Sequence, residues 1–396
     1  MPPDQLNALL EFLQAAQHAL RSFWQAIGLG SGVAGQPAWP WSHRLAAEML
    51  AIDGGHARRV VLALAAVAGG VTLGVAGLVL RRRRPRWAAG LWLAGGGVLL
   101  YAPWPQAHLL LAPAVPTSLH QSPTGFSAHS IVQGRAVYQQ HCARCHGTDA
   151  RGEGPEAAHL PVWPPMLTGG LLWKRLEGEL FWRVRHGMHD RQGQRTMPGV
   201  PADRVSDRQI WQVLDYLQAH AAGQMLRESG AWERPVRLPD MALDCRQGRR
   251  RVTDVVGQRL RLAVAGVAGS AGEAPADDPR FLTLQAGMGG AAAPADCTVA
   301  DPDGLPAIAL VLGVPPADLA GHQLLVDRAG WLRARATPGQ SQWSEDDLVC
   351  KAAGAPPGGP SAVRPRAPGG VDGLDALIRR MDAEPVRLVR GGFPHG

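Results

Sequence analysis

The chain has 396 residues, 46% of them hydrophobic, which fits two or three folded domains and excludes a wholly disordered protein. Glycine (49) and proline (33) are abundant, which predicts many connectors and argues against one large parallel sheet. The formal net charge of +7 includes five arginines within residues 81–86, and setting these aside leaves +2. No zinc-finger spacing or RNA-binding aromatic signature accompanies them, so nucleic acid is not expected as a partner.

Residues 1–57 are expected to combine an amphipathic helix with an extracytoplasmic stretch. From Leu6 to Ile27, apolar residues recur at helical spacing with polar residues between them. Such a helix can lie on a membrane surface or pack against membrane-spanning helices. A transmembrane placement would bury Glu11 and Arg21, which is costly.

Residues 58–106 predict a two-helix transmembrane hairpin. The stretch 60–80 has no charge and a single polar side chain, Thr72, and about 20 such residues span a bilayer. A second apolar run, 87–104, ends in aromatic residues that suit the water–lipid interface. The sequence therefore predicts that the lipid bilayer is a partner of this chain.

The hairpin also predicts an orientation and a helix contact. The protein is expected in the inner membrane of a bacterium. Arginine-rich loops stay in the cytoplasm, so the Arg81–Arg86 loop is expected on the cytoplasmic side. Everything from about residue 106 onward, starting with a linker over 107–127, is then expected in the periplasm. Gly70 and Gly74 form a GxxxG pair that could let another helix approach closely.

The stretch HCARCHG, residues 141–147, could be a zinc half-site, a redox dithiol or a haem attachment site. The CxxCH spacing is typical of covalent haem: Cys142 and Cys145 add to the haem vinyl groups, and His146 binds the iron. A zinc site needs about two more ligands, and the other cysteines lie about a hundred residues or more away. A thioredoxin-type CxxC would open a helix after a buried strand, whereas this motif follows a helical stretch. One covalently attached haem c is therefore predicted.

The flanks of this motif also predict helices. Downstream, Ser206 and Gln209 form a capping box ahead of an apolar helical pattern. Residues 128–222 resemble class I c-type cytochromes, whose first and last helices cross at a small residue and an aromatic, here Gly134 and Tyr216. The resemblance implies an all-α cytochrome c domain.

The same resemblance implies a sixth iron ligand in a short loop before the last helix. The segment RTMPGVP supplies Met197, 51 residues after His146. Four other residues in the intervening region compete for this role: Met166, Met188, His186 and His189. A methionine opposite a histidine gives a six-coordinate iron, which suits electron transfer rather than substrate binding.

Two further parts of the haem pocket are expected from this region. Pro155, at the end of the glycine-rich stretch GTDARGEGPE, is expected to offer the backbone carbonyl that orients His146. Trp163, Trp173 and Trp182 are expected to wall the pocket.

Residues 235–350 change to short β-type runs and resemble thioredoxin-like domains of the Sco and peroxiredoxin type. The segments LPDMAL, VVGQ and DRAGWLRA carry this resemblance, which implies an α/β domain. The segment VAGSAGEAPADDPR, where such domains hold their cysteine pair, has none. One disulfide among Cys245, Cys297 and Cys350 is expected, in any of three pairings. Copper binding would require two close cysteines together with His322.

These expectations combine into a multi-domain, membrane-anchored cytochrome. Residues 351–396 are expected to form a Pro/Gly-rich tail that could end in one more helix. The stretch LAIDGGHARR and the two apolar runs also resemble CopD-type proteins with a fused cytochrome. The favoured function is single-electron transfer with periplasmic or membrane redox proteins. The alternatives are a copper-handling or copper-oxidase assembly factor and a haem-based redox sensor. No nucleophile–base pair or open metal site indicates an enzyme.

Overall fold

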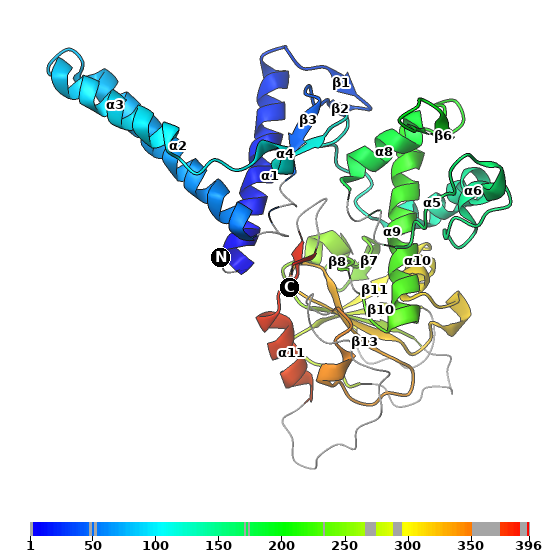
Figure 1. The fold of residues 1–396 in the computed structure, drawn as a ribbon. Coiled ribbons are helices and arrows are strands. Elements are labelled where there is room, and N and C mark those ends of the chain that lie inside the picture. The colour runs from blue at the N-terminus through cyan, green and yellow to red at the C-terminus, as the bar shows by residue number, and fades with distance from the viewer. Residues whose placement is uncertain are drawn as a thin grey trace. The chain divides into compact units, whose positions relative to one another are not determined.

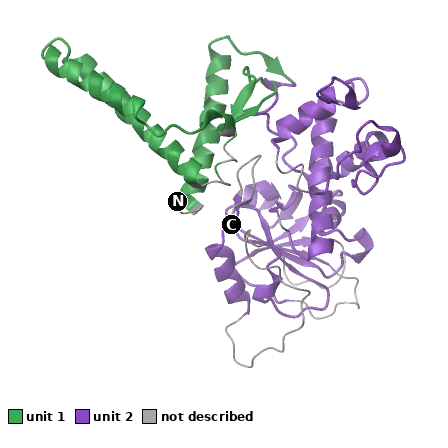
Figure 2. Ribbon diagram, viewed as in Figure 1, with its two compact units in different colours: residues 1–33, 37–116, 389–393 green, residues 34–36, 117–388, 394–396 purple. Residues whose placement is uncertain are grey.

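The computed structural model describes residues 3–46, 50, 54–169, 172, 175–232, 234–265, 275–287, 295–350, 373–388 and 394–395. The chain forms two compact units (Figure 2). The first comprises residues 1–33, 37–116 and 389–393, and the second comprises residues 34–36, 117–388 and 394–396. Trp173 and most of the tail, 351–372, lie outside the described residues.

Helix α1 (Pro3–Ala26) opens the first unit, as its apolar spacing predicts. Leu10 and Leu13 are buried in a small core with Leu50, Ala57, Val60 and Leu110. A second apolar stripe on the same helix is exposed and contains Phe12, Leu20, Phe23 and Ile27. Strands β1 (Gly32–Val33) and β2 (Gln36–Pro37) follow, and β3 (His43–Leu45) pairs antiparallel with β4 (Leu111–Pro113), which comes directly after α4 (Ala107–Leu110).

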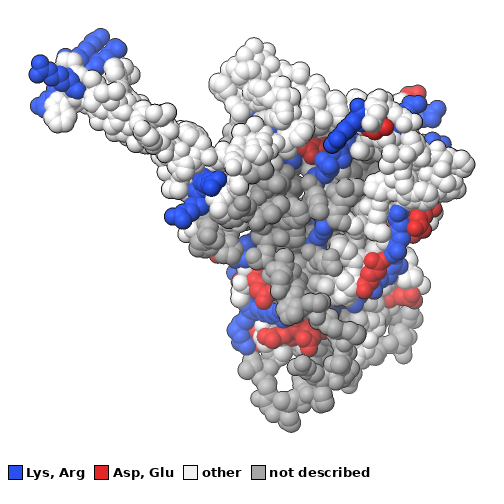
Figure 3. Space-filling view, in the orientation of Figure 1, with Lys and Arg blue, Asp and Glu red and all other residues white. Residues whose placement is uncertain are grey.

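Helices α2 (Gly54–Leu80) and α3 (Pro85–Leu100) form a long hairpin in this unit (Figure 1). Within the described part of the chain, one helix is long and apolar enough to cross a membrane, α2 over Gly55–Leu80. Helix α3 has 16 residues, about 24 Å, which falls short of the ~30 Å hydrocarbon core. In Figure 3, Lys and Arg gather at the two ends of the hairpin, and its visible side is uncharged.

The GxxxG pair of α2 packs against α3 of the same chain. A Cβ added at Gly70 would lie 2.9 Å from Cγ of Leu99, and the indole Nε1 of Trp92 donates to the Gly74 carbonyl at 3.1 Å. Gly70 therefore allows close approach within the hairpin, whereas a Cβ at Gly74 would meet nothing within 4 Å.

The second unit begins with the helical part that contains CxxCH. Helix α5 (Ala128–His141) is capped by the Ser127 hydroxyl, and α9 (Asp207–Ser229) starts with the predicted Ser206–Gln209 capping box. The two helices cross at Gly134, where a Cβ would lie 1.9 Å from the carbonyl oxygen of Gln212. Between them lie α6 (Ala143–His146), η2 (Ala157–His159), α8 (Glu177–His186), β5 (Met188–His189) and β6 (Arg195–Met197).

Helix α9 is longer than the sequence suggested, because it continues past residue 222 to Ser229. Ala222 and Leu226 are buried against the domain that follows. A Cβ at Gly223 would lie 2.0 Å from the carbonyl oxygen of Leu310. The added turns therefore belong to the packing of the C-terminal domain, and the helix ends at Gly230 in a left-handed conformation.

The C-terminal domain is a seven-stranded sheet in the order β13-β12-β9-β10-β11-β7-β8. Strand β10 pairs parallel with β9 and β11, and the other neighbouring strands pair antiparallel. The strands are β7 (Ala242–Cys245), β8 (Gly248–Arg251), β9 (Leu260–Val264), β10 (Leu282–Ala286), β11 (Cys297–Val299), β12 (Gln323–Val326) and β13 (Leu332–Ala336). The 3-10 helices η3 (Val252–Val255), η4 (Pro316–Asp318) and η5 (Glu345–Asp347) lie in the connections.

Helices cover both faces of this sheet. Helix α10 (Gly304–Leu312) and the end of α9 pack on one face, over Leu262, Leu284 and Leu324. Helix α11 (Gly373–Ala383) packs on the other through Leu374, Leu377, Ile378 and Met381. The helix suggested for the tail thus exists and forms part of this domain. The short strands β14 (Arg387–Leu388) and β15 (Pro394–His395) pair antiparallel beyond it.

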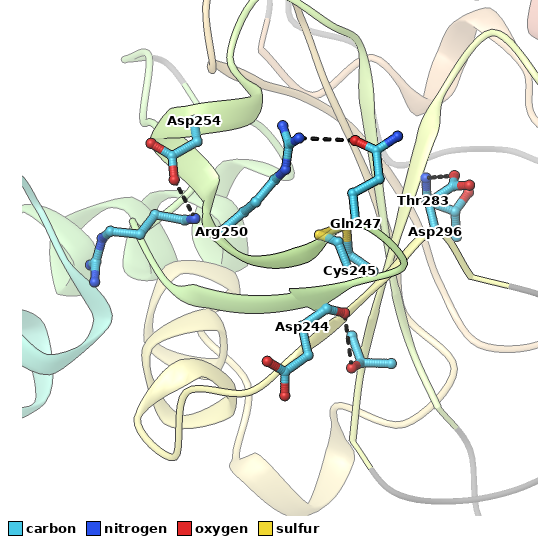
Figure 4. Close-up of a disulfide and its surroundings, with 10 residues drawn as sticks. Asp244, Cys245, Gln247, Arg250, Asp254, Thr283 and Asp296 are labelled. Carbon is cyan, nitrogen blue, oxygen red and sulfur yellow. Dashed lines mark hydrogen bonds between the residues drawn. A yellow bond between two sulfur atoms is a disulfide. The ribbon is translucent and has the colours of Figure 1, made fainter.

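One of the three open disulfide pairings is formed. Cys245 of β7 and Cys297 of β11 face each other in register and are joined by a disulfide (Figure 4). Cys350 is a free, buried thiol. Register between neighbouring strands determined this pairing, and a single sequence does not display register between strands that lie 52 residues apart.

Candidate haem-binding site

The two motif cysteines and the histidine come together on one helical turn. Helix α5 delivers Cys142, whose N–H donates to the Tyr138 carbonyl at 2.8 Å. The N–H of His146 in turn donates to the Cys142 carbonyl at 2.9 Å, which closes the turn α6. Cys142 and Cys145 are both half-buried free thiols. Their arrangement leaves both sulfurs available for thioether bonds beside the histidine.

The glycine-rich stretch after the motif folds back onto it. The N–H of Gly152 donates to the His146 carbonyl at 2.8 Å, and the N–H of Gly154 donates to the Cys145 carbonyl at 3.1 Å. A Cβ at Gly154 would lie 2.4 Å from the Arg144 carbonyl oxygen, so only glycine allows this approach. Gly152 has φ +88° and lies against the Pro164 carbonyl. These contacts fix the backbone on which the reactive side chains stand.

Tyrosines connect the motif to the helix crossing. The Tyr138 hydroxyl is buried and donates to the Gly147 carbonyl, directly after His146, at 2.8 Å. Its ring packs on that of Tyr216 of α9 with 5.2 Å between centroids. Burial raises the pKa of Tyr138, so the phenol stays protonated and keeps its donor. The predicted Gly134–Tyr216 crossing is therefore coupled by side chains to the end of the motif.

The imidazole of His146 is prepared as a neutral ligand. Burial lowers the pKa of His146, and an interaction with the Pro165 backbone carbonyl raises it by a smaller amount. Nδ1 is buried and makes no hydrogen bond of ordinary geometry. The backbone carbonyl that interacts with this ring belongs to Pro165, and the expectation that Pro155 orients His146 stays a prediction. The neutral form is the one that binds iron.

Met197 lies at the end of β6, where a short hairpin holds it. In this hairpin Met188 of β5 lies opposite Met197. A Cβ at Gly187 would lie 2.4 Å from the Met197 carbonyl oxygen, so glycine permits the close backbone contact. Met197 is half-buried, whereas the competing residues Met166, Met188, His186 and His189 are exposed. The His186 ring also packs on Trp182, 3.8 Å between centroids.

The described part of this domain leaves large apolar side chains uncovered around the motif. Val162, Trp163, Met166 and Met188 are 52%, 58%, 48% and 38% exposed, although folded proteins normally bury such side chains. A porphyrin is a large, flat and mostly apolar group, and it would cover surface of this kind. Together with the free thiols and the neutral histidine, the residues present therefore fit haem c. Among the described residues, no group of three or more His, Cys, Asp or Glu is placed to hold a metal ion.

Sequence reasoning missed two contributors to this site. Tyr138 counted only as an apolar helix residue, but its hydroxyl anchors Gly147. Pro165 lies in the stretch WPP, whose position beside the motif depends on the fold of the intervening loop. The glycine spacing in GTDARGEG was the available signal, because a glycine with positive φ predicts a chain reversal toward the motif.

Comparison with known proteins gives one family. No curated protein matches this chain. A solved chain of the Kuenenia stuttgartiensis reducing HAO-like protein complex Kustc0457/Kustc0458 aligns at 21% identity and a TM-score of 0.22, over 32% of this chain and 58% of that one. The family model described as cytochrome c oxidase, cbb3-type, subunit III matches residues 129–217. The chain therefore contains a c-type cytochrome domain, which implies covalently bound haem c and redox partner proteins.

Proposed function

We propose that this chain is a membrane-anchored, mono-haem cytochrome c that carries single electrons between partner proteins. The observation that carries the proposal is the CxxCH turn, with two free thiols and a half-buried neutral histidine inside a matched cytochrome domain. Cys142 and Cys145 would form the thioether bonds, and His146 and Met197 would bind the iron from opposite sides.

The residues around the CxxCH turn support this role because they fix the backbone of the turn. Electron transfer is fastest when little rearranges, and hydrogen bonds from Gly152, Gly154 and Tyr138 fix the backbone that carries His146. The half-buried thioether of Met197 favours reduced iron, because a neutral soft ligand stabilises the lower charge. With His146 and Met197 as its ligands, the iron would have no open site for a substrate, which suits an electron carrier.

A membrane anchor with its outer domains in the periplasm of a bacterium is part of the proposal. Helix α2 has the length and composition of a span, and exposed apolar side chains such as Val71, Val75 and Val79 suit contact with lipid. The arginines of residues 81–86 favour a cytoplasmic position for the loop between α2 and α3. The haem domain, which follows in sequence, would then lie where c-type cytochromes acquire their haem.

The C-terminal domain is proposed as a thioredoxin-like scaffold without a dithiol. Four neighbouring strands, in the order β10-β9-β12-β13 with the first pair parallel and the rest antiparallel, support this fold. Two of its three cysteines are joined in a disulfide, so no observation favours the copper-handling alternative. The proposed role is to support and present the haem domain, with which it shares α9.

The test is the optical spectrum of the detergent-solubilised full chain made in a cell competent in cytochrome c maturation. We expect haem that stays attached under denaturing electrophoresis, one haem per chain, a low-spin spectrum in both oxidation states and no reaction with carbon monoxide. Protein without covalent haem would refute the proposal. Ready carbon monoxide binding would replace the carrier role with one that uses an open iron site.

A further inference from the structure

A carboxyl group is buried inside the cytochrome domain, away from the CxxCH motif. Asp215 of α9 is 5% exposed. The Ser130 hydroxyl of α5 donates to its Oδ2 at 2.5 Å, and the Thr124 hydroxyl donates to the same oxygen at 2.5 Å. No basic side chain is paired with Asp215 among the ion pairs of the described residues. Burial of a charged group without a cationic partner is costly, and such a group tends to take up a proton.

A chain of hydroxyl groups connects this buried carboxyl with the surface. Thr124, which donates to Asp215, also lies 2.5 Å from the Ser122 hydroxyl. Ser122 is half-buried, so the hydroxyl chain ends near solvent, and the Ser122 backbone N–H, which is not part of that chain, donates to Oε2 of the exposed Glu177 at 3.4 Å. Hydroxyl groups donate and accept at once, so they can pass a proton by rotating. The buried carboxyl therefore has a route for proton exchange with solvent through Thr124 and Ser122.

Asp215 is also connected to the haem motif through packed side chains. The next residue, Tyr216, packs on Tyr138, and the Tyr138 hydroxyl binds the carbonyl of Gly147, which follows His146. These contacts lie in a water-poor core, where charges act on each other over longer distances than in solvent. A change of charge at the haem would thus be felt at Asp215 with little screening.

We infer that Asp215 is a proton-binding site whose occupancy is coupled to the oxidation state of the haem, an inference that rests on the proposed function. When the domain takes one electron from a partner protein, the Asp215 carboxylate takes one proton from a hydronium ion of the solvent, which leaves water, and forms an O–H bond. Oxidation reverses both transfers. One electron and one proton enter together, so the net charge of the domain is unchanged.

The charged groups around Asp215 agree with titration in the physiological range. Burial raises the pKa of Asp215 to about 7, the hydrogen bonds from Ser130 and Thr124 lower it by less, and Glu177 raises it slightly. On α5, His129 is paired with Asp303, and the positive charge of Arg135 lowers the pKa of Tyr216. Oxidised iron carries one more positive charge and favours the carboxylate. The reduction potential should therefore fall as pH rises through the pKa of Asp215, and should level off on either side.

The test measures the reduction potential of the haem-loaded full chain between pH 5 and pH 9. The variants are Asp215→Asn, which keeps the shape but cannot titrate, and Asp203→Asn at an exposed position as the matched control. We expect the wild type and the control to show the fall in potential, and Asp215→Asn to lose most of it. A purely structural Asp215 would shift stability but leave the pH dependence intact, and that result would overturn the inference.

A second measurement does not require haem. The infrared band of a protonated carboxylic acid, followed against pH in the protein without haem, should disappear with a midpoint near 7 and be missing in Asp215→Asn. A midpoint below pH 5 would contradict the inference. If the chain bound no haem, the proposed function would fail on its own evidence. The infrared titration would then still decide whether Asp215 binds a proton near neutral pH.

Discussion

The cytochrome domain and the C-terminal sheet domain bury their apolar side chains in different ways. The sheet is covered on both faces by helices of its own unit, so Leu262 and Leu324 on one face and Leu325 on the other are fully buried. Around the CxxCH turn, Trp163 and Met166 remain exposed by about half. The core of the sheet domain is fully covered and includes Ile131 of α5 and Leu226 of α9, whereas the cytochrome domain has apolar surface that haem would cover. Covered apolar surface is typical of a folded core, and uncovered apolar surface is typical of a binding site.

Helix α9 is shared by the two domains. Its first half carries Tyr216 at the crossing with α5, and its second half carries Leu226 in the core of the sheet domain. The two domains differ in the state of their cysteine pairs: Cys142 and Cys145 of the cytochrome domain are free thiols, and Cys245 and Cys297 of the sheet domain form a disulfide. Paired substitutions can therefore test whether each domain depends on the other.

The largest effect is expected at the two pairs of cysteines. Cys142→Ser with Cys145→Ser should abolish covalent haem, because no thiol remains to form a thioether. Cys245→Ser with Cys297→Ser should leave haem attachment intact and lower the free energy of unfolding of the sheet domain by about 2–4 kcal/mol. Haem staining after denaturing electrophoresis and urea unfolding measure the two results. Loss of covalent haem in the second pair would show that the domains do not fold separately.

The next largest effect is expected at the two methionines that lie opposite each other in the β5–β6 hairpin. Met197→Ala should open the sixth position, so that the spectrum becomes high-spin and the reduced protein binds carbon monoxide. Met188→Ala, on the neighbouring strand, is the matched control and should keep the low-spin spectrum. The reverse pattern would assign the sixth ligand to Met188.

The parts of this molecule that were predictable from sequence depend on short-range patterns. The capping box at Ser206 and the helix that leads to Cys142 follow from residues in fixed spacing, and the Gly134–Tyr216 crossing follows from the resemblance to class I c-type cytochromes. The interaction of the Pro165 carbonyl with the His146 ring depends on how a loop folds back, and the sequence also offers Pro155 near the same motif. No local signal distinguishes them.

The extension of α9 was not predictable for a related reason. Four of the five residues 219–223 are alanine or glycine, so they give no apolar periodicity, and the burial of Gly223 depends on the close approach of α10. Helix α11 does show an apolar stripe, but which surface it covers is decided by the sheet. Long-range packing fixed both features.

Two glycines of α9 and its partner α5 offer a smaller and more selective test. Gly134→Ala would place a methyl group 1.9 Å from the Gln212 oxygen, and Gly223→Ala would place one 2.0 Å from the Leu310 oxygen. Each should cost about 3 kcal/mol, because the helices must separate. Hydrogen exchange should show the loss of protection around 128–146 for the first and around 304–336 for the second. The exposed Arg208→Ala is the control, and equal loss in both regions would mean that the unit unfolds as one.

The smallest expected effect is at Arg333, a buried residue of β13 that connects the sheet with α11 through hydrogen bonds. Its guanidinium is 1% exposed and donates to the carbonyls of Met381 at 3.1 Å and Glu384 at 2.6 Å, at the carboxyl end of the helix. A cation there satisfies carbonyls that the helix leaves open and complements its dipole. Arg333→Leu should therefore cost about 2–3 kcal/mol, since the carbonyls stay buried without a donor.

That loss should be confined to the sheet domain. Hydrogen exchange of residues 373–383 should become faster in Arg333→Leu, while the haem spectrum and the protection of α5 stay at wild-type values. Arg379→Leu, at an exposed position on the same helix, is the matched control and should exchange like the wild type. If Arg333→Leu also released or altered the haem, α11 would stabilise the cytochrome domain through the sheet and the shared α9. The two domains would then unfold as one cooperative structure, as the side chains of α5 and α9 in the core of the sheet would allow.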